Sequence, residues 1–389
     1  MRKLLLFILM SWAVSDAGAQ ANFIKSQDWD GIRKEAAAAK KLIFLDAYTD
    51  WCGWCKVMDK KTFADSGIGA FMNQHFINLK LEMEKEDLGI QLALKYGITS
   101  FPTYLVFNSD GELVYQTVGY QEVSVFQKTL NEMVSPDHHV KRPGYTPKFN
   151  LYYPEFYLLA MQGNGKKKFP TDTLVQAWFN MNSDLSQEIN WTVFSRFVGQ
   201  MDEAGLEQFW ETKPSLDSLY GRDKTDDIAG TILGSQIQRL AKSREPDRAE
   251  KLLKERLPLL QNGAESGFYY RLYLYKEMEV WAEVKSLLDK RFADKGMDDA
   301  NWWNTQAWDV YENSNDEALL ASALTWIDAV CKENKDYNYL DTHAALLKKA
   351  GKLDEAEKKA EEAIEVGKAN GNNVLGTVKL LDEIRKAKP

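Results

Sequence analysis

A short apolar run at residues 42–47 leads directly into the sequence Trp-Cys-Gly-Trp-Cys at residues 51–55. The run is rich in Leu and Phe and predicts a buried strand, interrupted by a single carboxylate, Asp46. The residues that follow have the apolar spacing of an amphipathic helix. This pattern predicts two thiols at a strand-to-helix junction, with Cys52 just before the helix and Cys55 within its first turn. Helix N-termini favour negative charge, so a thiol placed there ionises more readily than a free one.

The N-terminus has the three parts of a secretory signal. Arg2 and Lys3 form a charged start, residues 4–14 are apolar, and residues 17–19 supply the small side chains of a cleavage site. An apolar stretch of roughly ten residues is too short to span about 30 Å of hydrocarbon, which argues against a membrane anchor. We therefore expect residues 1–19 to be a signal peptide and the mature protein to be exported, to a periplasm or to the medium.

Charge and cysteine content exclude other classes of protein. The formal net charge of −8 argues against a nucleic-acid partner, because a surface that binds phosphates is normally basic. The chain has three cysteines, Cys52, Cys55 and Cys331, too few for a disulfide scaffold of this size. Chemistry explains the close pair best, but a purely structural bridge and half of a zinc site stay open as alternatives. A structural zinc needs four ligands, and no second Cys or His pair has ligand spacing, so we expect no metal and no cofactor.

Residues 20–135 are predicted to form an α/β domain, in the order βα, βα, hairpin and helix. Asp110-Gly111 between two apolar runs is a strong hairpin signal. The predicted strands are Leu42–Ala47, Phe76–Leu81, Pro102–Phe107 and Glu112–Val118. The predicted helices are Ile32–Lys40, one after Cys55 that runs to about Phe63, Gly67–His75, Asp87–Lys95 and Val123–Met133.

These motifs, taken as a set, resemble those of thioredoxin-fold proteins. Trp-Cys-Gly-Trp-Cys-Lys at residues 51–56 is similar to the family's tryptophan-flanked Cys-x-x-Cys, and Asp46, six residues before the first Cys, matches its buried aspartate. Phe-Pro-Thr at residues 101–103 resembles the segment that carries the family's cis-proline. Gly119 matches another family glycine near the active site. The resemblance covers roughly residues 25–135.

The resemblance also implies a role for each residue of the site. Cys52 would attack a substrate disulfide, and Cys55 would resolve the mixed disulfide. Burial raises the pKa of a carboxyl, so Asp46 could accept a proton near neutral pH and, by analogy, deprotonate Cys55. The alternative for Asp46 is a hydrogen-bonded strand-end residue with no catalytic part. Lys80, in the neighbouring predicted strand, is a candidate ion-pair partner for it. Trp54 stands where thioredoxin has proline, which looks more like exported thioredoxin-like proteins.

The substrate side of the site is predicted from Phe101 and Pro102. A cis bond between them would leave backbone groups facing the cysteine pair, where they could align a substrate peptide. The alternative is an ordinary proline on an edge strand. Trp51, Gly53, Trp54 and Phe101 are predicted to face the substrate, although the tryptophans could instead belong to the core.

The second half of the chain is predicted to be all-helical. Residues 136–149 contain three prolines and read as a linker, followed by a helical domain at residues 150–389. The candidate helices before residue 290 are Val175–Met181, Trp191–Met201, Ile228–Leu240, Ala249–Leu260 and Gly267–Lys276.

The C-terminal region resembles a tetratricopeptide-type repeat. A helix at residues 341–347 is followed by a turn at Gly351 and by a second helix with alanines at 356, 360 and 363, which let helices pack closely. Residues 304–329 form a looser copy. The many Trp and Tyr residues of this half would build the core between helix pairs or, alternatively, line a groove for a peptide. Cys331 is expected to be a small buried apolar residue, with a redox role as the alternative.

The leading hypothesis is an exported thiol–disulfide oxidoreductase, with reductase favoured over oxidase or isomerase, that reduces disulfides of envelope proteins through its Cys-Gly-Trp-Cys dithiol. Its helical domain would bind a protein partner. A membrane-bound thiol protein is the electron donor that the resemblance implies. The alternative is an envelope adaptor, in which the helical domain binds a partner and the thioredoxin-like half is a docking platform.

Overall fold

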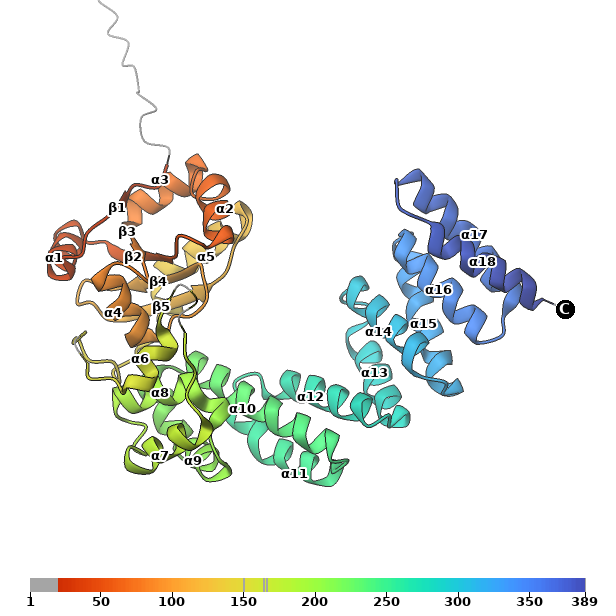
Figure 1. The fold of residues 1–389 in the computed structure, drawn as a ribbon. Coiled ribbons are helices and arrows are strands. Elements are labelled where there is room, and N and C mark those ends of the chain that lie inside the picture. Colours follow the sequence, from red (N-terminus) through yellow and green to blue (C-terminus); the bar gives the residue numbers. More distant parts are fainter. Residues whose placement is uncertain (1–19, 150, 164, 166, 389) are drawn as a thin grey trace, which may run out of the picture. The chain divides into compact units, whose positions relative to one another are not determined.

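A computed structural model gives the fold of the protein (Figure 1). The described residues are 20–149, 151–163, 165 and 167–388. The predicted signal peptide at residues 1–19 lies outside them. The chain divides into two compact units, the first ending at Ile232 and the second beginning at Leu233. Over the described part of the chain, no helix combines the length and the apolar character needed to cross a membrane.

A mixed five-stranded sheet, in the order β1-β3-β2-β4-β5, lies at the centre of the thioredoxin-like domain in the first unit. The strands are β1 (Phe23–Ile24), β2 (Leu42–Tyr48), β3 (Phe76–Glu82), β4 (Thr103–Phe107) and β5 (Leu113–Val118). β1 and β2 run parallel to β3, whereas β4 is antiparallel to both β2 and β5. Because β2 is central, Asp46 has a neighbour on each side, Lys80 of β3 and Tyr104 of β4.

Helices cover both faces of this sheet. Side chains alternate between the faces along a strand, so Ile43 and Leu45 of β2 pack with one helix group and Phe44 packs with the other. The group on the face of Ile43 comprises α1 (Trp29–Ala39) and α4 (Asp87–Tyr96), and the group on the face of Phe44 comprises α2 (Gly53–Lys61), α3 (Ser66–His75) and α5 (Val123–Val134). By the same alternation Asp46 belongs to the face of Phe44, which α2 covers. The predicted α/β architecture is therefore confirmed.

β1 was not predicted from the sequence, and the predicted start of β4 was one residue too early, each for a local reason. β1 has only two residues, too few to give a periodic pattern. β4 begins at Thr103 rather than at Pro102. Pro102 has no N–H to donate to a ladder, and its carbonyl instead accepts a hydrogen bond from the Gly119 N–H at 2.8 Å.

The rest of the first unit is helical. It contains a 3₁₀ turn η1 (Pro136–His138), α6 (Glu155–Met161), α7 (Asp172–Met181), α8 (Glu188–Phe197), a 3₁₀ turn η2 (Val198–Gln200), α9 (Glu203–Tyr220) and the beginning of α10 (Arg222–Lys242). The segment at residues 136–149 forms backbone hydrogen bonds both to the sheet and to the helices that follow it. The Val140 N–H donates to Val114 O of β5 at 2.9 Å, and the Gly144 N–H donates to Leu219 O of α9 at 2.8 Å.

A buried ion pair joins the thioredoxin-like domain to these helices. Lys95, in the last turn of α4, contacts Glu188, the first residue of α8, and the two side chains are 1% and 5% exposed. The Glu188 carboxylate also accepts hydrogen bonds from the Thr146 N–H and hydroxyl, each at 2.7 Å. Lys95 donates a further bond to the Lys148 carbonyl at 3.0 Å. Because both charges have several partners, the pair fixes α8 against the end of α4.

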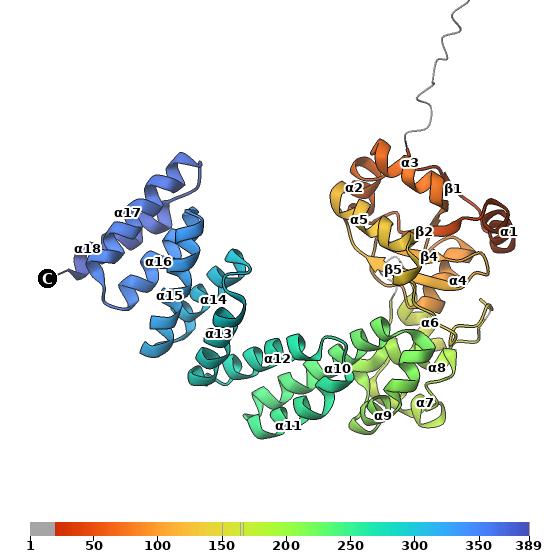
Figure 2. The ribbon, with the colours of Figure 1, turned by 180° about the vertical axis from the view of Figure 1, so that it is seen from behind.

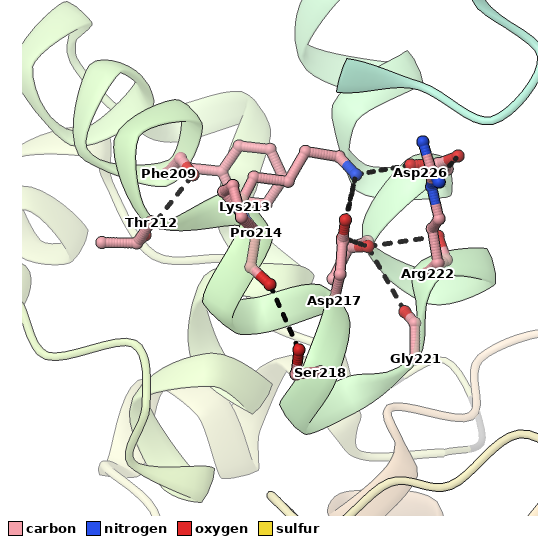
Figure 3. Close-up of polar contacts among 10 residues, drawn as sticks. Phe209, Thr212, Lys213, Pro214, Asp217, Ser218, Gly221, Arg222 and Asp226 are labelled. Atoms are coloured by element: carbon pink, nitrogen blue, oxygen red, sulfur yellow. Dashed lines mark hydrogen bonds and ion pairs between the residues drawn. The ribbon is translucent and has the colours of Figure 1, made fainter. Parts of the chain in front are cut away.

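Helix α9 lies outside the helices predicted from the sequence, because Pro214 stands inside it. An interior proline removes one backbone hydrogen bond and normally argues against a helix. Here tertiary contacts act against that effect (Figure 3). The buried Lys213 ammonium lies 2.9 Å from Asp217 and also pairs with Asp226 of α10, so it ties the two helices together.

The second unit consists of helices that pack in chain order. They are the remainder of α10, α11 (Pro246–Arg256), a 3₁₀ turn η3 (Leu257–Leu259), α12 (Gly263–Glu277), α13 (Trp281–Lys295), α14 (Ala300–Asn313), α15 (Glu317–Glu333), α16 (Tyr337–Lys349), α17 (Leu353–Ala369) and α18 (Leu375–Ala387). Figure 2 shows the helices from α14 to α18 side by side, and each of them contacts the next one along the chain. Each of the five candidate helices predicted before residue 290 coincides with a helix, and two of them run on into η2 and η3.

The predicted C-terminal helix pair is confirmed as a pair. Gly351 has a positive φ of 74° in the turn between α16 and α17, a conformation that favours glycine. Ala356, Ala360 and Ala363 of α17 are fully buried, so the two helices approach closely there. Assignment of this pair to tetratricopeptide-type repeats stays a prediction.

Aromatic side chains form much of the helical core. Trp191 and Tyr220 stack in the first unit with ring centroids 4.6 Å apart, and both are fully buried. Trp303 and Trp326 pack together in the second unit at 5.4 Å and are equally buried. At these positions the aromatic residues serve the core, which was the first of the two alternatives.

Candidate functional site

The cysteine pair lies where the sequence predicts, between β2 and α2. Cys52 is the N-cap of α2, and Cys55 lies in its first turn. The two sulfurs form a disulfide, with the Cα atoms 5.4 Å apart. The Cys55 N–H donates to the Cys52 sulfur at 3.0 Å. This arrangement places the Cys52 sulfur at the positive end of the helix, where a thiolate would be stabilised after reduction.

Attack by Cys52 on a substrate disulfide needs an accessible sulfur, but the structure buries both members of the pair. Both cysteines are 3% exposed. In this oxidised state the Cys52 sulfur lies against Cys55 and the first turn of α2. The indoles of Trp51 and Trp54 stand in solvent instead, at 58% and 61% exposure.

Two ring contacts connect the cysteine segment to other loops. Trp51 packs edge-on against Phe101 with ring centroids 5.8 Å apart, and Trp54 stacks on Tyr120 at 5.4 Å. The Trp51 indole N–H also donates to the Glu84 carboxylate at 3.0 Å. Sequence reasoning missed Tyr120 and Glu84. The position of Tyr120 directly after the predicted Gly119 was the signal that could have found it.

The proline loop meets the loop after β5. The Phe101–Pro102 peptide bond is cis, as the sequence predicts. Gly119 has a φ of 100°, which favours glycine, and its N–H holds the Pro102 carbonyl. The Thr103 hydroxyl donates to the Ser100 carbonyl at 2.7 Å and fixes the other end of the loop. Together with the two ring contacts, these bonds assemble the cysteine, proline and glycine segments into one surface region.

Asp46 is a buried carboxyl in the middle of β2, only 1% exposed. Burial raises its pKa from 3.8 to about 6, against the lowering effect of the Lys80 ammonium. One carboxyl oxygen, Oδ2, lies 2.9 Å from Lys80 Nζ. The other, Oδ1, is buried and has no hydrogen-bond partner among the described residues. A group with this pKa and one uncommitted oxygen can accept a proton near neutral pH.

Lys80 connects Asp46 to the protein surface. The predicted pairing of Lys80 with Asp46 is confirmed, and the same ammonium also pairs with Asp59 of α2, whose side chain is 44% exposed. Burial by itself lowers the pKa of Lys80, but the Asp46 and Asp59 carboxylates outweigh it and raise that pKa. The Tyr48 ring lies 4.9 Å from the Lys80 nitrogen. Asp59 has no signal in the sequence, because only the docking of α2 on the sheet brings it to β3.

The third cysteine, Cys331, lies far along the chain from the Cys52–Cys55 pair. Cys331 lies in α15 of the second unit, is 4% exposed, and burial raises the pKa of its thiol to about 12. It is the buried apolar residue that the sequence predicts. Within the described ranges, no group of three or more His, Cys, Asp or Glu side chains is placed to hold a metal ion.

Comparisons with known proteins agree on the first domain. Residues 30–133 match the family described as "Thioredoxin-like domain". A proposed disulphide-isomerase from Bacteroides thetaiotaomicron, whose solution structure is known, is 37% identical over 31% of this chain and 97% of that chain, with a TM-score of 0.28. The N-terminal domain of this chain therefore belongs to the thioredoxin-like family.

Curated relatives match a shorter share of their own length. Protein disulfide isomerase-like 5-3 of rice (Oryza sativa subsp. japonica) is 23% identical over 165 residues, which cover 41% of this chain and 38% of that protein. Thiol:disulfide interchange protein DsbD of Salmonella typhimurium is 28% identical over 131 residues, which cover 32% of this chain and 23% of that protein. The chain thus spans well under half the length of these relatives.

Proposed function

We propose that this protein is an exported thiol–disulfide oxidoreductase that reduces disulfides of other proteins. The observation that carries the proposal is the cysteine pair at the N-terminus of α2, with the buried Asp46 on the strand that leads into it. The names of the similar proteins, which include disulfide isomerases and a thiol:disulfide interchange protein, support exchange chemistry at the level of the family.

We propose the following reaction for these groups. In the reduced protein, the Cys52 thiolate attacks one sulfur of a substrate disulfide and displaces the other as a thiolate. Asp46 takes the proton of the Cys55 thiol, directly or through a water molecule. The Cys55 thiolate then attacks Cys52, releases the substrate as a dithiol and leaves the Cys52–Cys55 disulfide. Two electrons pass from the protein to the substrate, and the structure corresponds to the oxidised product.

The substrate would bind across the surface formed by the cysteine and proline loops. We propose that Trp51, Gly53, Trp54 and Phe101 contact the substrate and that the backbone at Pro102 aligns it. The exposed indoles offer apolar area next to the sulfurs. We further propose that a membrane-bound thiol protein returns electrons to the pair, and that the helical domain, as tetratricopeptide-like repeats, binds a protein partner.

One observation favours the alternative of an adaptor that docks but does not exchange thiols. Both cysteines are buried, so attack by the thiolate of a reducing partner on the Cys52–Cys55 disulfide requires movement of the residues around it. A redox titration separates the two functions. The full-length protein is equilibrated against glutathione or dithiothreitol buffers, and reduction of insulin disulfides is assayed alongside.

We expect the pair to titrate as a two-electron couple and the Cys52→Ser variant to lose insulin reduction. The matched control is Cys331→Ala, which removes the buried thiol of α15 and should leave the rate unchanged. A pair that never exchanges with either buffer would leave the adaptor as the better account. The measured potential also decides between reductase and oxidase.

A further inference from the structure

A small cavity lies within the first unit, where the thioredoxin-like domain meets the helices that follow it. Its volume is about 150 Å³. The end of α4 and the loop after it form one wall, and α8 and the first turn of α10 form the other. The lining includes five residues whose ammonium, guanidinium or hydroxyl groups can donate hydrogen bonds to an anion: Lys95, Thr99, Ser195, Arg196 and Lys224.

The cavity has more positive than negative charge. Lys95 is neutralised by its ion pair with Glu188. Across the described residues, neither Arg196 nor Lys224 has a carboxylate within ion-pair distance. Three acidic residues lie within three positions of Lys224 in the sequence. Asp223 is already bound by Arg142, Asp226 is bound by Lys213, and Asp227 attracts the ammonium without forming an ion pair.

Hydrogen-bonding groups at the cavity are also unsatisfied. The Arg196 Nε and the Ser195 hydroxyl oxygen are buried, and no group in the described part of the chain forms a hydrogen bond with either. The Phe169 ring lies 5.1 Å from the Arg196 guanidinium, a contact that supplies no acceptor. Burial lowers the pKa of both Arg196 and Lys224. Buried polar groups in folded proteins are normally bonded, so these donors call for a partner that the chain does not provide.

We propose that this cavity binds one small oxyanion, meaning phosphate, sulfate or the carboxylate of a small organic acid. Arg196 and Lys224 neutralise its charge, and the hydroxyls of Ser195 and Thr99 are further donors. Guanidinium and ammonium groups are the usual partners of such anions, and the volume suits a small anion rather than a nucleotide. The bound anion connects the loop that continues to Pro102 with α8 and α10, and so stabilises the docking of the helices on the thioredoxin-like domain.

The test is a titration of the full-length protein by calorimetry, with thermal unfolding alongside. The probes are inorganic phosphate, sulfate and acetate, each compared with chloride at equal ionic strength. We expect saturable binding of at least one probe and a rise in Tm beyond that given by chloride. Arg196→Gln and Lys224→Gln should each weaken the affinity at least about tenfold, because each removes a charge-assisted bond.

The matched control is Lys128→Gln, which removes an exposed lysine of α5 and should bind the probe as the wild type does. A higher affinity for phosphate and sulfate than for acetate assigns a tetrahedral inorganic anion, and the reverse assigns a carboxylate. If Lys224→Gln does not fold, Arg196→Lys and Ser195→Ala provide the comparison, with the serine variant expected to weaken binding. The proposal is overturned if wild type shows no saturable binding of any probe. It is equally overturned if the Arg196 variants bind as tightly as wild type, or if Lys128→Gln loses as much affinity as they do.

Discussion

Replacing Asp46 with asparagine gives a stability change whose size follows from the site. Burial raises the pKa of this carboxyl from 3.8 to about 6. An acid with a raised native pKa holds its proton more tightly in the folded chain than in the unfolded chain. Its favourable contribution is therefore complete below about pH 4 and is lost as the pH rises toward and through 6. At about 1.4 kcal/mol per pH unit, the ionised carboxyl lowers the free energy of unfolding at neutral pH by about 3 kcal/mol.

Asparagine does not ionise, so the Asp46→Asn protein escapes this loss. Between about pH 4.5 and pH 7.5, the free energy of unfolding of the variant should rise by about 2 kcal/mol relative to that of the wild type. This difference is measured by urea unfolding of the two oxidised proteins. Unfolding is followed through amide hydrogen exchange of β2 and β3, which reports on the first unit alone. A pH-independent effect of the lost Lys80 contact cancels in this comparison.

Asp59→Asn is the matched control, because Asp59 shares the Lys80 ammonium but is 44% exposed. Its difference from wild type should change less over the same range than that of Asp46→Asn, because the buried Asp46 carboxyl is retained. A constant difference for Asp46→Asn, or one that shrinks as the pH rises, would refute the raised pKa and with it the suitability of Asp46 as a base near neutral pH. A slower resolution of mixed disulfides by the variant, measured at neutral pH, would support that role separately.

Two further changes test the packing around the site. Glu188→Gln leaves the buried Lys95 charge without its carboxylate and should lower the free energy of unfolding of the first unit by about 3–5 kcal/mol. The double variant Glu188→Gln/Lys95→Met removes that charge as well and should recover most of the loss. The same urea experiment measures both. Gly89→Ala places a Cβ 2.4 Å from the Glu82 carbonyl oxygen and should destabilise the protein by about 1–3 kcal/mol, measured as a lower thermal midpoint. In the control Gly199→Ala the new Cβ meets nothing within 4 Å, so the thermal midpoint should stay nearly unchanged. Equal effects of the two variants would contradict the close contact at Gly89.

The local chemistry of the site could be predicted because it is written in adjacent residues. The strand, the N-cap position of Cys52 and the hairpin at Asp110-Gly111 all depend on short patterns with a fixed period or turn geometry. The cis bond before Pro102 was expected from the resemblance of residues 101–103 to the family's cis-proline segment, and Asp46 from its place in an apolar strand six residues before Cys52. A two-residue strand such as β1 and a helix that contains Pro214 give no such pattern, and both were missed.

The sequence by itself determined the order of the main elements of the thioredoxin-like domain, the cysteine pair and the candidate acid–base residue, since each of these depends on near neighbours along the chain. Only the tertiary structure decided the burial of Cys52, the addition of Asp59 to the Lys80 ion pairs and the packing of Tyr120 on Trp54. It also decided that α8 docks on α4 through a buried ion pair and leaves a basic cavity beside it. These features join residues far apart in the chain, and their energies come from burial and charge, which no local pattern encodes.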